Sequence, residues 1–470
     1  MQRPRASADE QNMNWRTGAV ALMMGGALFA QDIHLKARTL KGAYQPEERT
    51  AVRHASGDTD TASVHKIIQF DHAPGVEDID SLLRDGIPVV GALPDNAVVV
   101  SAPGGHLPPR PGVRWIGRIQ AADKVSPEMA FLVTPAPDLV TFMAIVEFYP
   151  DISPAQQETV AGFEGLTLQR PAVLRSDHAI VTATAAQFRA LTSHDEVAYI
   201  FPADPALLTD TGLIPCAGML TISGMIGQYA NIVHGWDLDS DHAAHLGYAF
   251  GSITPKVPAS TVKSEVVRAL TEWSRYTNVI FQPAANSSSP RTVLVKFVSG
   301  YHGDAWPFDG PGGILAHTFY PVPVNTESLA GDMHLDADEN WHAGGDIDIY
   351  SVALHEAGHP IGLSHSDKPG DVMYPYYRSR ASLSANDIGA AQTLYGLPTG
   401  SPEPVTISTG DPSPPIGPVA LSLVLDTLPA TSQTASIALT GTLSGGKAPY
   451  SVQWQTDHGY SGKAPIQSYG

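Results

Sequence analysis

The chain has 470 residues, which is too long for one ordinary domain, and 43% of them are hydrophobic, enough to bury several cores. The 47 acidic residues exceed the 28 basic ones, giving a formal net charge of −19. This balance argues against nucleic acid as a partner, because phosphate binding needs concentrated Lys and Arg. The single cysteine, Cys216, excludes an intrachain disulfide, so hydrophobic cores and bound metal ions must supply stability outside the cell.

Residues 1–30 are typical of a secretory signal. A basic start after Met13 precedes a short apolar run that ends near Ala30, where we expect cleavage. The run is too short and too rich in Gly for a membrane span, and no later segment reaches the required length. The sequence therefore predicts a secreted, extracellular protein, with residues 31–63 as a polar leader.

Residues 64–204 show one order of elements twice, with corresponding landmarks roughly 80 residues apart. The expected strands are 66–70, 97–100, 113–116, 144–148, 178–181 and 197–200, and the expected helices are 76–83, 156–162 and 187–191. The layout resembles the ferredoxin-like N-terminal regions of some secreted bacterial proteases. It predicts a pro-region of two small α+β units, with a binding module as the alternative.

A connecting segment, 205–244, leads to a further domain, whose predicted elements begin near Leu246. Alternating apolar residues predict strands at 247–250 and 293–297. Between them, Val262, Val266 and Leu270 share one side of a helix predicted over Thr261–Tyr276.

The segment 302–339 concentrates side chains that can hold metal ions. Three imidazoles and one carboxylate form the kind of four-ligand set that closes around a structural zinc: His302, Asp304, His317 and His334. Asp309, Asp336 and Glu339, with backbone carbonyls from a glycine turn, form an all-oxygen set suited to calcium. The alternative for both sets is a polar loop with solvated carboxylates.

The stretch from His355 to His365 has the form H-E-x-x-H-x-x-G-x-x-H. On a helix, residues four apart share a face, so His355 and His359 can point two imidazoles at one metal ion. Glu356 is placed to take a proton from a water on that metal. Gly362 can adopt a positive φ, end the helix and let the chain turn back to deliver His365. Three nitrogens and an open position predict a catalytic zinc.

Residues 245–397 resemble the catalytic domain of the matrixins, the matrix-metalloproteinase-like zinc endopeptidases of the metzincin clan. The resemblance rests on His302–Asp309, the Gly-Pro-Gly-Gly-Ile-Leu-Ala-His run, Gly331–Glu339, the zinc motif, the segment 371–377 and a closing helix over 383–396. It implies a twisted mixed sheet with three helices, two zinc ions per chain, and proteolysis. It also implies a calcium site made by Asp309, Gly310, Gly312, Ile314, Asp336 and Glu339, with the Gly and Ile residues acting through carbonyls.

By the same resemblance, Met373 occupies the Met-turn beneath the zinc ligands, and Tyr377 walls the S1′ pocket. Two features depart from the family pattern. Pro360 directly follows the second histidine, where we expect it to kink the end of the helix. The inhibitory propeptide motif Pro-Arg-Cys-Gly-x-Pro-Asp is absent, although Cys216 lies in Pro-Cys-Ala-Gly and a thiolate is an excellent zinc ligand. Cys216 is therefore a candidate inhibitory ligand, with a simply buried thiol as the alternative.

Residues 398–418 are rich in Pro, Ser and Thr and predict a linker, and 419–470 alternate like strands of a partial immunoglobulin-like β module. The sequence thus predicts a multidomain α+β protein. Its expected function is that of a secreted, monomeric, calcium-stabilised zinc endopeptidase acting on proteins or peptides, with a C-terminal module that contacts a cell surface or matrix. The alternative is a non-catalytic surface-binding protein that keeps its metal sites for folding.

Overall fold

The computed structural model describes residues 32–41, 63–133, 140–209, 213–216, 218–221, 223–231, 234–304, 306–322, 324–379 and 382–398, together with four C-terminal strands. Residues 1–402 and 403–470 are separate compact units. The predicted signal segment, most of the leader and nearly all of the 398–418 linker lie outside the described residues. No described helix combines the length and the apolar composition needed to cross a bilayer.

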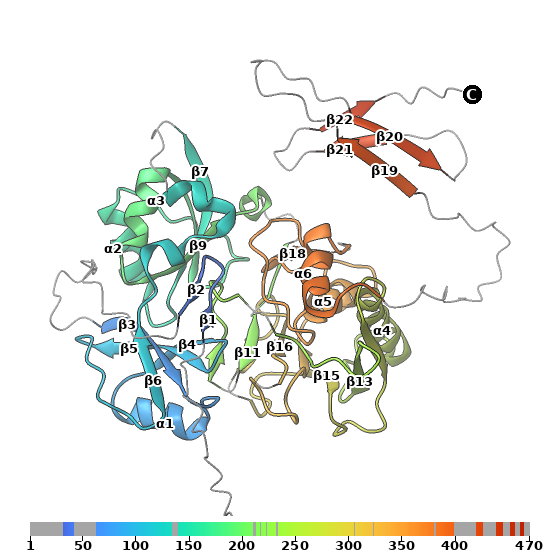
Figure 1. The fold of residues 1–470 in the computed structure, drawn as a ribbon, viewed down its shortest axis with the longest axis horizontal. Coiled ribbons are helices and arrows are strands. Elements are labelled where there is room, and N and C mark those ends of the chain that lie inside the picture. The colour runs from blue at the N-terminus through green and yellow to red at the C-terminus, as the bar shows by residue number, and fades with distance from the viewer. Residues whose placement is uncertain are drawn as a thin grey trace, which may run out of the picture. The chain divides into compact units, whose positions relative to one another are not determined.

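The first α+β unit is a four-stranded antiparallel sheet with one helix (Figure 1). Its elements are β3 (Ser63–Phe70), α1 (Val76–Arg84), β4 (Val89–Leu93), β5 (Ala97–Pro103) and β6 (Val113–Gly117). The strand order is β4-β5-β3-β6, and Leu82 of α1 is buried against Ile68 and Val98 of the sheet. The three strands and the helix predicted here are confirmed.

The second α+β unit has two helices and a three-stranded antiparallel sheet in the order β8-β7-β9. Its elements are β7 (Thr141–Phe148), α2 (Pro154–Phe163), β8 (His178–Thr184), α3 (Ala185–Thr192) and β9 (Val197–Pro202). Ser153 and Thr184 cap the two helices with hydroxyl groups that accept backbone N–H bonds. All predicted strands and helices of this unit are confirmed. The ferredoxin-like description of the two units stays a prediction, because the first unit has only one α-helix among its described residues.

Short elements surround these units. They are β1 (Ile33–His34), β2 (Thr39–Leu40) and the 3₁₀ helices η1 (Ala121–Lys124), η2 (Pro127–Val133) and η3 (Pro205–Leu208). The strands β1 and β2 form an antiparallel hairpin before β3, and Arg38 beyond β1 pairs with the fully buried Asp123 of η1 at 2.6 Å.

The third domain has three described α-helices and a seven-stranded mixed sheet in the order β12-β11-β16-β17-β15-β13-β14. Its elements are β13 (Ala244–Phe250), α4 (Ala259–Ser274), β14 (Val279–Pro283), β15 (Thr292–Val298), β16 (Ala316–Phe319), β17 (Met333–Asp336), α5 (Ile349–Glu356), β18 (Tyr376–Arg378) and α6 (Ala385–Tyr395). Strands β13, β14, β15 and β17 are parallel, and β16 runs antiparallel to β17. The predicted mixed sheet and three helices are confirmed.

The connecting segment does more than link domains. It supplies β10 (Leu213–Pro215), β11 (Met219–Thr221) and β12 (Gly224–Met225). Strand β10 pairs antiparallel with β18, and β11 pairs parallel with β16 at the edge of the large sheet, where Figure 1 shows the two strands next to each other. The segment between the α+β units and the third domain is therefore built into the third domain.

The C-terminal unit has two antiparallel strand pairs in its described residues: β19 (Ala420–Leu425) with β20 (Leu439–Ser444), and β21 (Val452–Gln455) with β22 (Ser461–Ala464). These strands agree with the alternation in the sequence. The immunoglobulin-like assignment stays a prediction.

A buried histidine ties the two α+β units together. His65 on β3 contacts Asp195 with Nδ1 at 2.6 Å and Asp151 with Nε2 at 3.0 Å, and its ring stacks on Tyr149. Burial disfavours the protonated ring, but the hydrogen bonds to both carboxylates outweigh burial and raise the pKa of His65 to about 9. His65 is therefore positively charged in the folded protein at neutral pH.

We predict a pH-dependent contribution of His65 to stability. Because its folded-state pKa lies above the unfolded value near 6.5, the stabilisation is complete below about pH 6.5 and is lost as the pH rises through about 9. The shift corresponds to about 3 kcal/mol. His65→Gln should lower the melting temperature near pH 6, and the gap from wild type should narrow above pH 9. A gap that is equal at both pH values would contradict the assignment.

Candidate active site

The first two histidines of the motif lie at the end of helix α5. Asp348 caps the start of this helix by accepting the Ser351 N–H at 3.0 Å, and the helix ends at Glu356. His359 lies in the turns beyond, where its own N–H donates to the Glu356 carbonyl at 3.1 Å. The prediction that one helix carries both histidines is thus wrong by one turn, and Pro360, which lacks an N–H, explains the early end.

The three imidazoles nevertheless converge. The ring centroids of His355, His359 and His365 are 5.0–5.2 Å apart. The Nδ1 of His355 faces the Val372 carbonyl, and the Nδ1 of His359 faces the Leu363 carbonyl at 2.8 Å. These bonds fix the rings with Nε2 toward the shared space, as second-shell partners of metal-bound histidines do.

Burial keeps these imidazoles neutral, the form that binds metals. It lowers the pKa of His359 to about 4 and those of His355 and His365 well below the usual value. The Nε2 of His365 is buried and has no hydrogen-bond partner among the described residues. A buried, orphaned ring nitrogen beside two more imidazoles fits a metal ion better than an empty core.

Two glycines shape the turn between the histidines. Gly362 has φ +92°, and a Cβ there would lie 2.9 Å from the His234 carbonyl oxygen, so the predicted reversal at this residue requires glycine. A Cβ on Gly358 would lie 2.3 Å from the sulfur of Met373. Met373 is therefore packed directly against the histidine turn, as the Met-turn prediction requires.

Cys216 completes the cluster. Its Sγ lies 3.8 Å from His359 Nε2, and the ligand atoms of Cys216, His355, His359 and His365 all lie within 4.8 Å of one another. A tetrahedral zinc with ordinary Zn–S and Zn–N bonds separates sulfur from nitrogen by about 3.6 Å. The four side chains therefore fit one zinc ion.

The backbone on both sides of Cys216 is held by the third domain. The Cys216 N–H donates to the Pro375 carbonyl at 3.0 Å, beside the β10–β18 pair, and β11 follows on β16. Gly218, at φ +102°, returns its own N–H to Cys216 Sγ at 3.2 Å. The thiol is thus placed by paired strands, not by a free loop.

Glu356 is completely buried and has two partners. Its Oε1 lies 3.3 Å from Cys216 Sγ, and its Oε2 accepts the Thr318 hydroxyl at 2.7 Å. Burial raises the pKa of Glu356 to about 7, although both hydrogen bonds oppose the rise. Sequence reasoning missed Thr318, whose only signal is its place next to His317 on a strand.

The predicted four-ligand set gathers around one point. Asp304 Oδ2 lies 2.8 Å from His302 Nε2, 3.2 Å from His317 Nε2 and 2.9 Å from His334 Nδ1. Ligands at ordinary zinc distances stand about 3.3 Å apart around a tetrahedron. Burial lowers the pKa values of His317 and His334, so both rings are neutral. This set has the spacing and the charge state of a closed zinc site.

The predicted oxygen set lies nearby. Glu339 Oε1 accepts the Gly312 N–H at 2.8 Å, and Asp309 Oδ1 accepts the Ile314 N–H at 3.0 Å. Asp336 Oδ2 is buried without a hydrogen-bond partner among the described residues. Burial raises the pKa values of Asp336 and Glu339, and repulsion between the carboxylates adds to the rise. Such a group of carboxylates is stabilised by a hard cation such as calcium.

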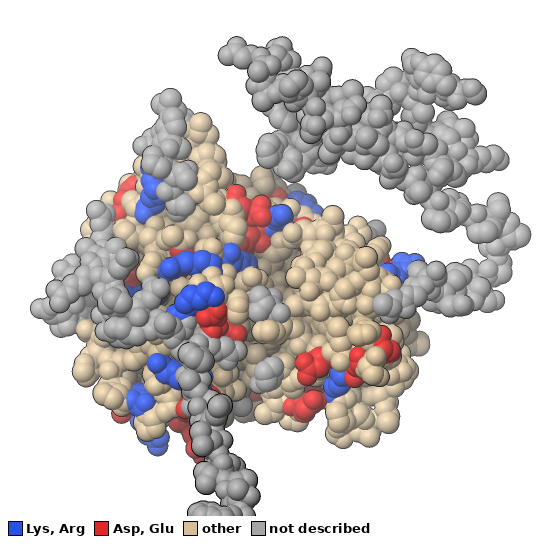
Figure 2. Space-filling view, in the orientation of Figure 1, with Lys and Arg blue, Asp and Glu red and all other residues tan. Residues whose placement is uncertain are grey.

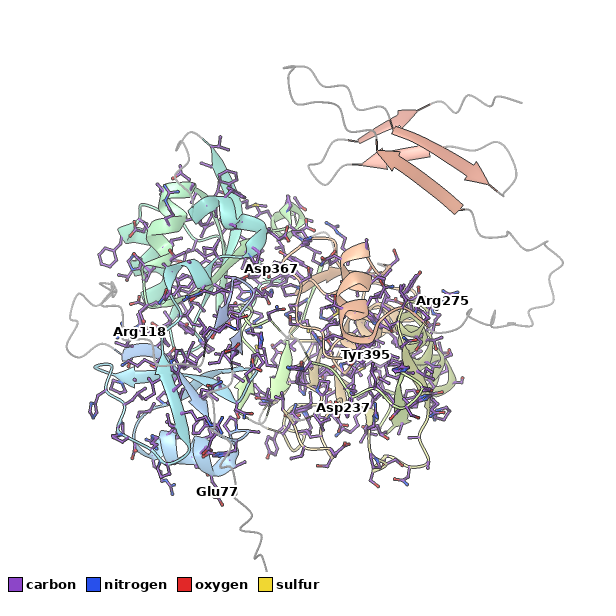
Figure 3. The ribbon with its side chains drawn as sticks, in the orientation of Figure 1. Glu77, Arg118, Asp237, Arg275, Asp367 and Tyr395 are labelled. Atoms are coloured by element: carbon purple, nitrogen blue, oxygen red, sulfur yellow. The ribbon has the colours of Figure 1, made fainter. Side chains whose placement is uncertain are left out.

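The leader, the second α+β unit and the connecting segment each supply a side chain to Asp367, two residues after His365. Asp367 accepts hydrogen bonds from Lys36 Nζ at 2.6 Å, Tyr199 Oη at 2.7 Å and Gln228 Nε2 at 2.8 Å. Figure 3 labels Asp367 where the second α+β unit meets the third domain. No local pattern in the sequence indicates this network of hydrogen bonds.

A second polar contact joins β8 to the strand after the Met-turn. Tyr376 Oη lies 2.6 Å from His178 Nδ1, and Arg378 pairs with Asp204 at 2.8 Å. Oppositely charged side chains also lie close together on the face drawn in Figure 2. The backbone of Tyr377 pairs with Ile214, but its side chain lies outside the described residues, so the S1′ assignment stays a prediction.

Comparison with known proteins points to the family that the sequence motifs resemble. Residues 238–396 match the family model of the matrixins, the M10 peptidases, close to the predicted limits 245–397. Stromelysin-1 from Mus musculus is 37% identical over 174 residues, which are 35% of this chain and 35% of that protein.

Other relatives agree. Matrix metalloproteinase-16 from Homo sapiens is 35% identical over 173 residues, covering 34% of this chain and 28% of that protein. Interstitial collagenase from Equus caballus is 38% identical over 155 residues, 32% of each. The chain thus spans about a third of the length of these relatives. The chain carries a matrixin metalloprotease domain, and residues 238–396 are that domain.

Proposed function

We propose that the chain is a secreted zinc endopeptidase held latent by its own N-terminal region. The observation that carries the proposal is the convergence of Cys216 on three buried imidazoles and Glu356. His355, His359 and His365 would hold the catalytic zinc, which when bound lowers the pKa of a water and polarises the substrate carbonyl. Cys216 would fill the fourth position in the latent chain.

Glu356 would act as the general base. Its buried carboxylate, with a pKa near neutrality, can accept a proton from the attacking water and return it to the amine that leaves. The pairing of β10 with β18 and of β11 with β16 also supports a site that binds peptides. An extended peptide binds a sheet by adding a strand, and β10 and β11 already cover the edges of β18 and β16. Strands β10 and β11 would therefore keep a substrate peptide from pairing with β18 and β16 until they are removed.

The α+β units would form the pro-region. Lys36 and Tyr199 hold Asp367 beside the third histidine, and His178 holds Tyr376 beside the strand that pairs with β10. His302, Asp304, His317 and His334 would hold a second, structural zinc, and the oxygen set from Asp309 to Glu339 would hold calcium. We further propose that the C-terminal strands belong to a module that contacts a cell surface or matrix.

The first prediction tests catalysis. Glu356→Gln should leave zinc bound and lower peptide hydrolysis by about 10²–10⁴-fold, because the general base is lost. Hydrolysis of a quenched peptide by the activated chain, with and without a chelator, is the measurement. Activity within about twofold of wild type would remove Glu356 from the mechanism and favour the alternative of a non-catalytic binding protein.

The second prediction concerns the structural zinc. The wild-type chain should contain two zinc ions, and His317→Ala should contain one, since a closed site does not survive the loss of a ligand. Elemental analysis of the dialysed protein gives the count. His245→Ala, which removes a half-buried histidine outside both clusters, is the matched control and should keep both ions. One zinc ion in the wild-type chain would refute the second site.

The third prediction concerns latency. In the uncleaved chain, Cys216→Ser should produce peptide hydrolysis that a chelator abolishes, because a serine hydroxyl competes poorly with water for zinc. Peptide hydrolysis by the uncleaved Cys216→Ser chain should remain below that of the processed enzyme, since β10 and β11 still pair with β18 and β16. If the Cys216→Ser chain is as latent as wild type, the strands or the α+β units alone inhibit the enzyme.

A further inference from the structure

We infer that Thr318 is a positioning residue for the proposed reaction, and that its hydroxyl group holds the Glu356 carboxylate in the orientation the general base requires. The inference rests on the proposed function and deepens it. Thr318 lies in β16 and is 0% exposed. Its Oγ1 donates to Glu356 Oε2 at 2.7 Å, a contact that joins the strand to the end of helix α5.

The two sides of β16 serve different sites. Successive side chains on a strand point to opposite faces of the sheet. His317 turns toward the four-ligand cluster, where its Nε2 lies 3.2 Å from Asp304. Thr318 therefore turns toward Glu356, and one short strand fixes both a structural-zinc ligand and the orientation of the general base.

The hydrogen bond from Thr318 to Glu356 is the one that remains after the proposed activation. The structure gives the Glu356 carboxylate two side-chain partners, Cys216 on Oε1 and Thr318 on Oε2. Cys216 belongs to the connecting segment, which is removed in the proposed activation. Thr318 belongs to the matrixin domain itself and stays.

Without the hydroxyl, little would fix the direction of the carboxylate. The terminal torsion of a glutamate side chain is broad and roughly two-fold, so Oε1 could rotate away from the site. A hydrogen bond to a charged, buried acceptor is strong enough to prevent this rotation. The valine side chain matches threonine in shape and lacks only the donor.

The test compares Thr318→Val and Thr318→Ser in the full chain after activation by limited proteolysis, with Glu356→Gln as the blank. Thr318→Val should lower kcat by about 10- to 100-fold at an unchanged KM, and Thr318→Ser should restore most of it, since serine keeps the donor. Zinc content should not change. Thr277→Val is the matched control, because it removes another buried hydroxyl, one that donates to the Trp273 carbonyl, and should keep kcat.

Different outcomes would contradict the positioning role of Thr318 and the proposed endopeptidase function. A kcat of Thr318→Val within about twofold of wild type, or equal losses in Thr318→Val and Thr318→Ser, would overturn the positioning role. If the activated wild-type chain shows no chelator-sensitive hydrolysis, the proposed function fails instead. Crystal structures of the proteolysed variants, which lack Cys216, then decide the inference: the Glu356 carboxylate should rotate in Thr318→Val and keep its direction in Thr318→Ser.

Discussion

The site depends on one constraint: three imidazoles and a carboxylate are removed from water, and each must find partners inside the protein. Unmatched buried polar groups are costly, so the surrounding backbone is arranged to supply them. The Val372 and Leu363 carbonyls accept hydrogen bonds from two of the rings, and the Thr318 hydroxyl donates to the Glu356 carboxylate. The ligand atoms of the three rings then lie within 4.8 Å of one another and of Cys216, the arrangement in which we propose a zinc ion. The Met-turn and the glycine turn follow from the same need, because they bring those carbonyls within reach.

The need of buried polar groups for hydrogen-bond partners also explains why the N-terminal region folds onto the matrixin domain. Asp367 is 6% exposed, and its hydrogen-bond partners Lys36, Tyr199 and Gln228 all come from segments before residue 238. An N-terminal region that supplies partners to a buried carboxylate stabilises the domain that it contacts. Under the proposed cleavage, Asp367 would be exposed to water, which solvates a carboxylate well, so the domain would lose a contact without retaining a buried unpaired charge.

Much of the site could be predicted because its signals are local. The zinc motif, the glycine-rich turn and the strand and helix periods lie within short windows, and the structure brings each predicted histidine to its expected cluster. Thr318 and Asp367 were missed because their partners are 38 and 331 residues away, and such contacts leave no periodic trace. Strands β10 to β12 were missed for another reason. Each has only two or three residues, too few for alternation to show.

Pro360 shows how a local rule can be correct while its expected consequence is not. An interior proline costs a helix about 3 kcal/mol because it removes an N–H bond and crowds the carbonyl four residues before it. Here that carbonyl, on Glu356, already accepts the His359 N–H, and the helix has ended. The Pro360 carbonyl accepts the Trp236 indole N–H at 2.5 Å, and the Pro360 ring packs beside Gly331, where an added Cβ would lie 3.5 Å from it. Pro360 therefore lies beyond the end of α5, in the turns that bring His359 and then His365 to His355.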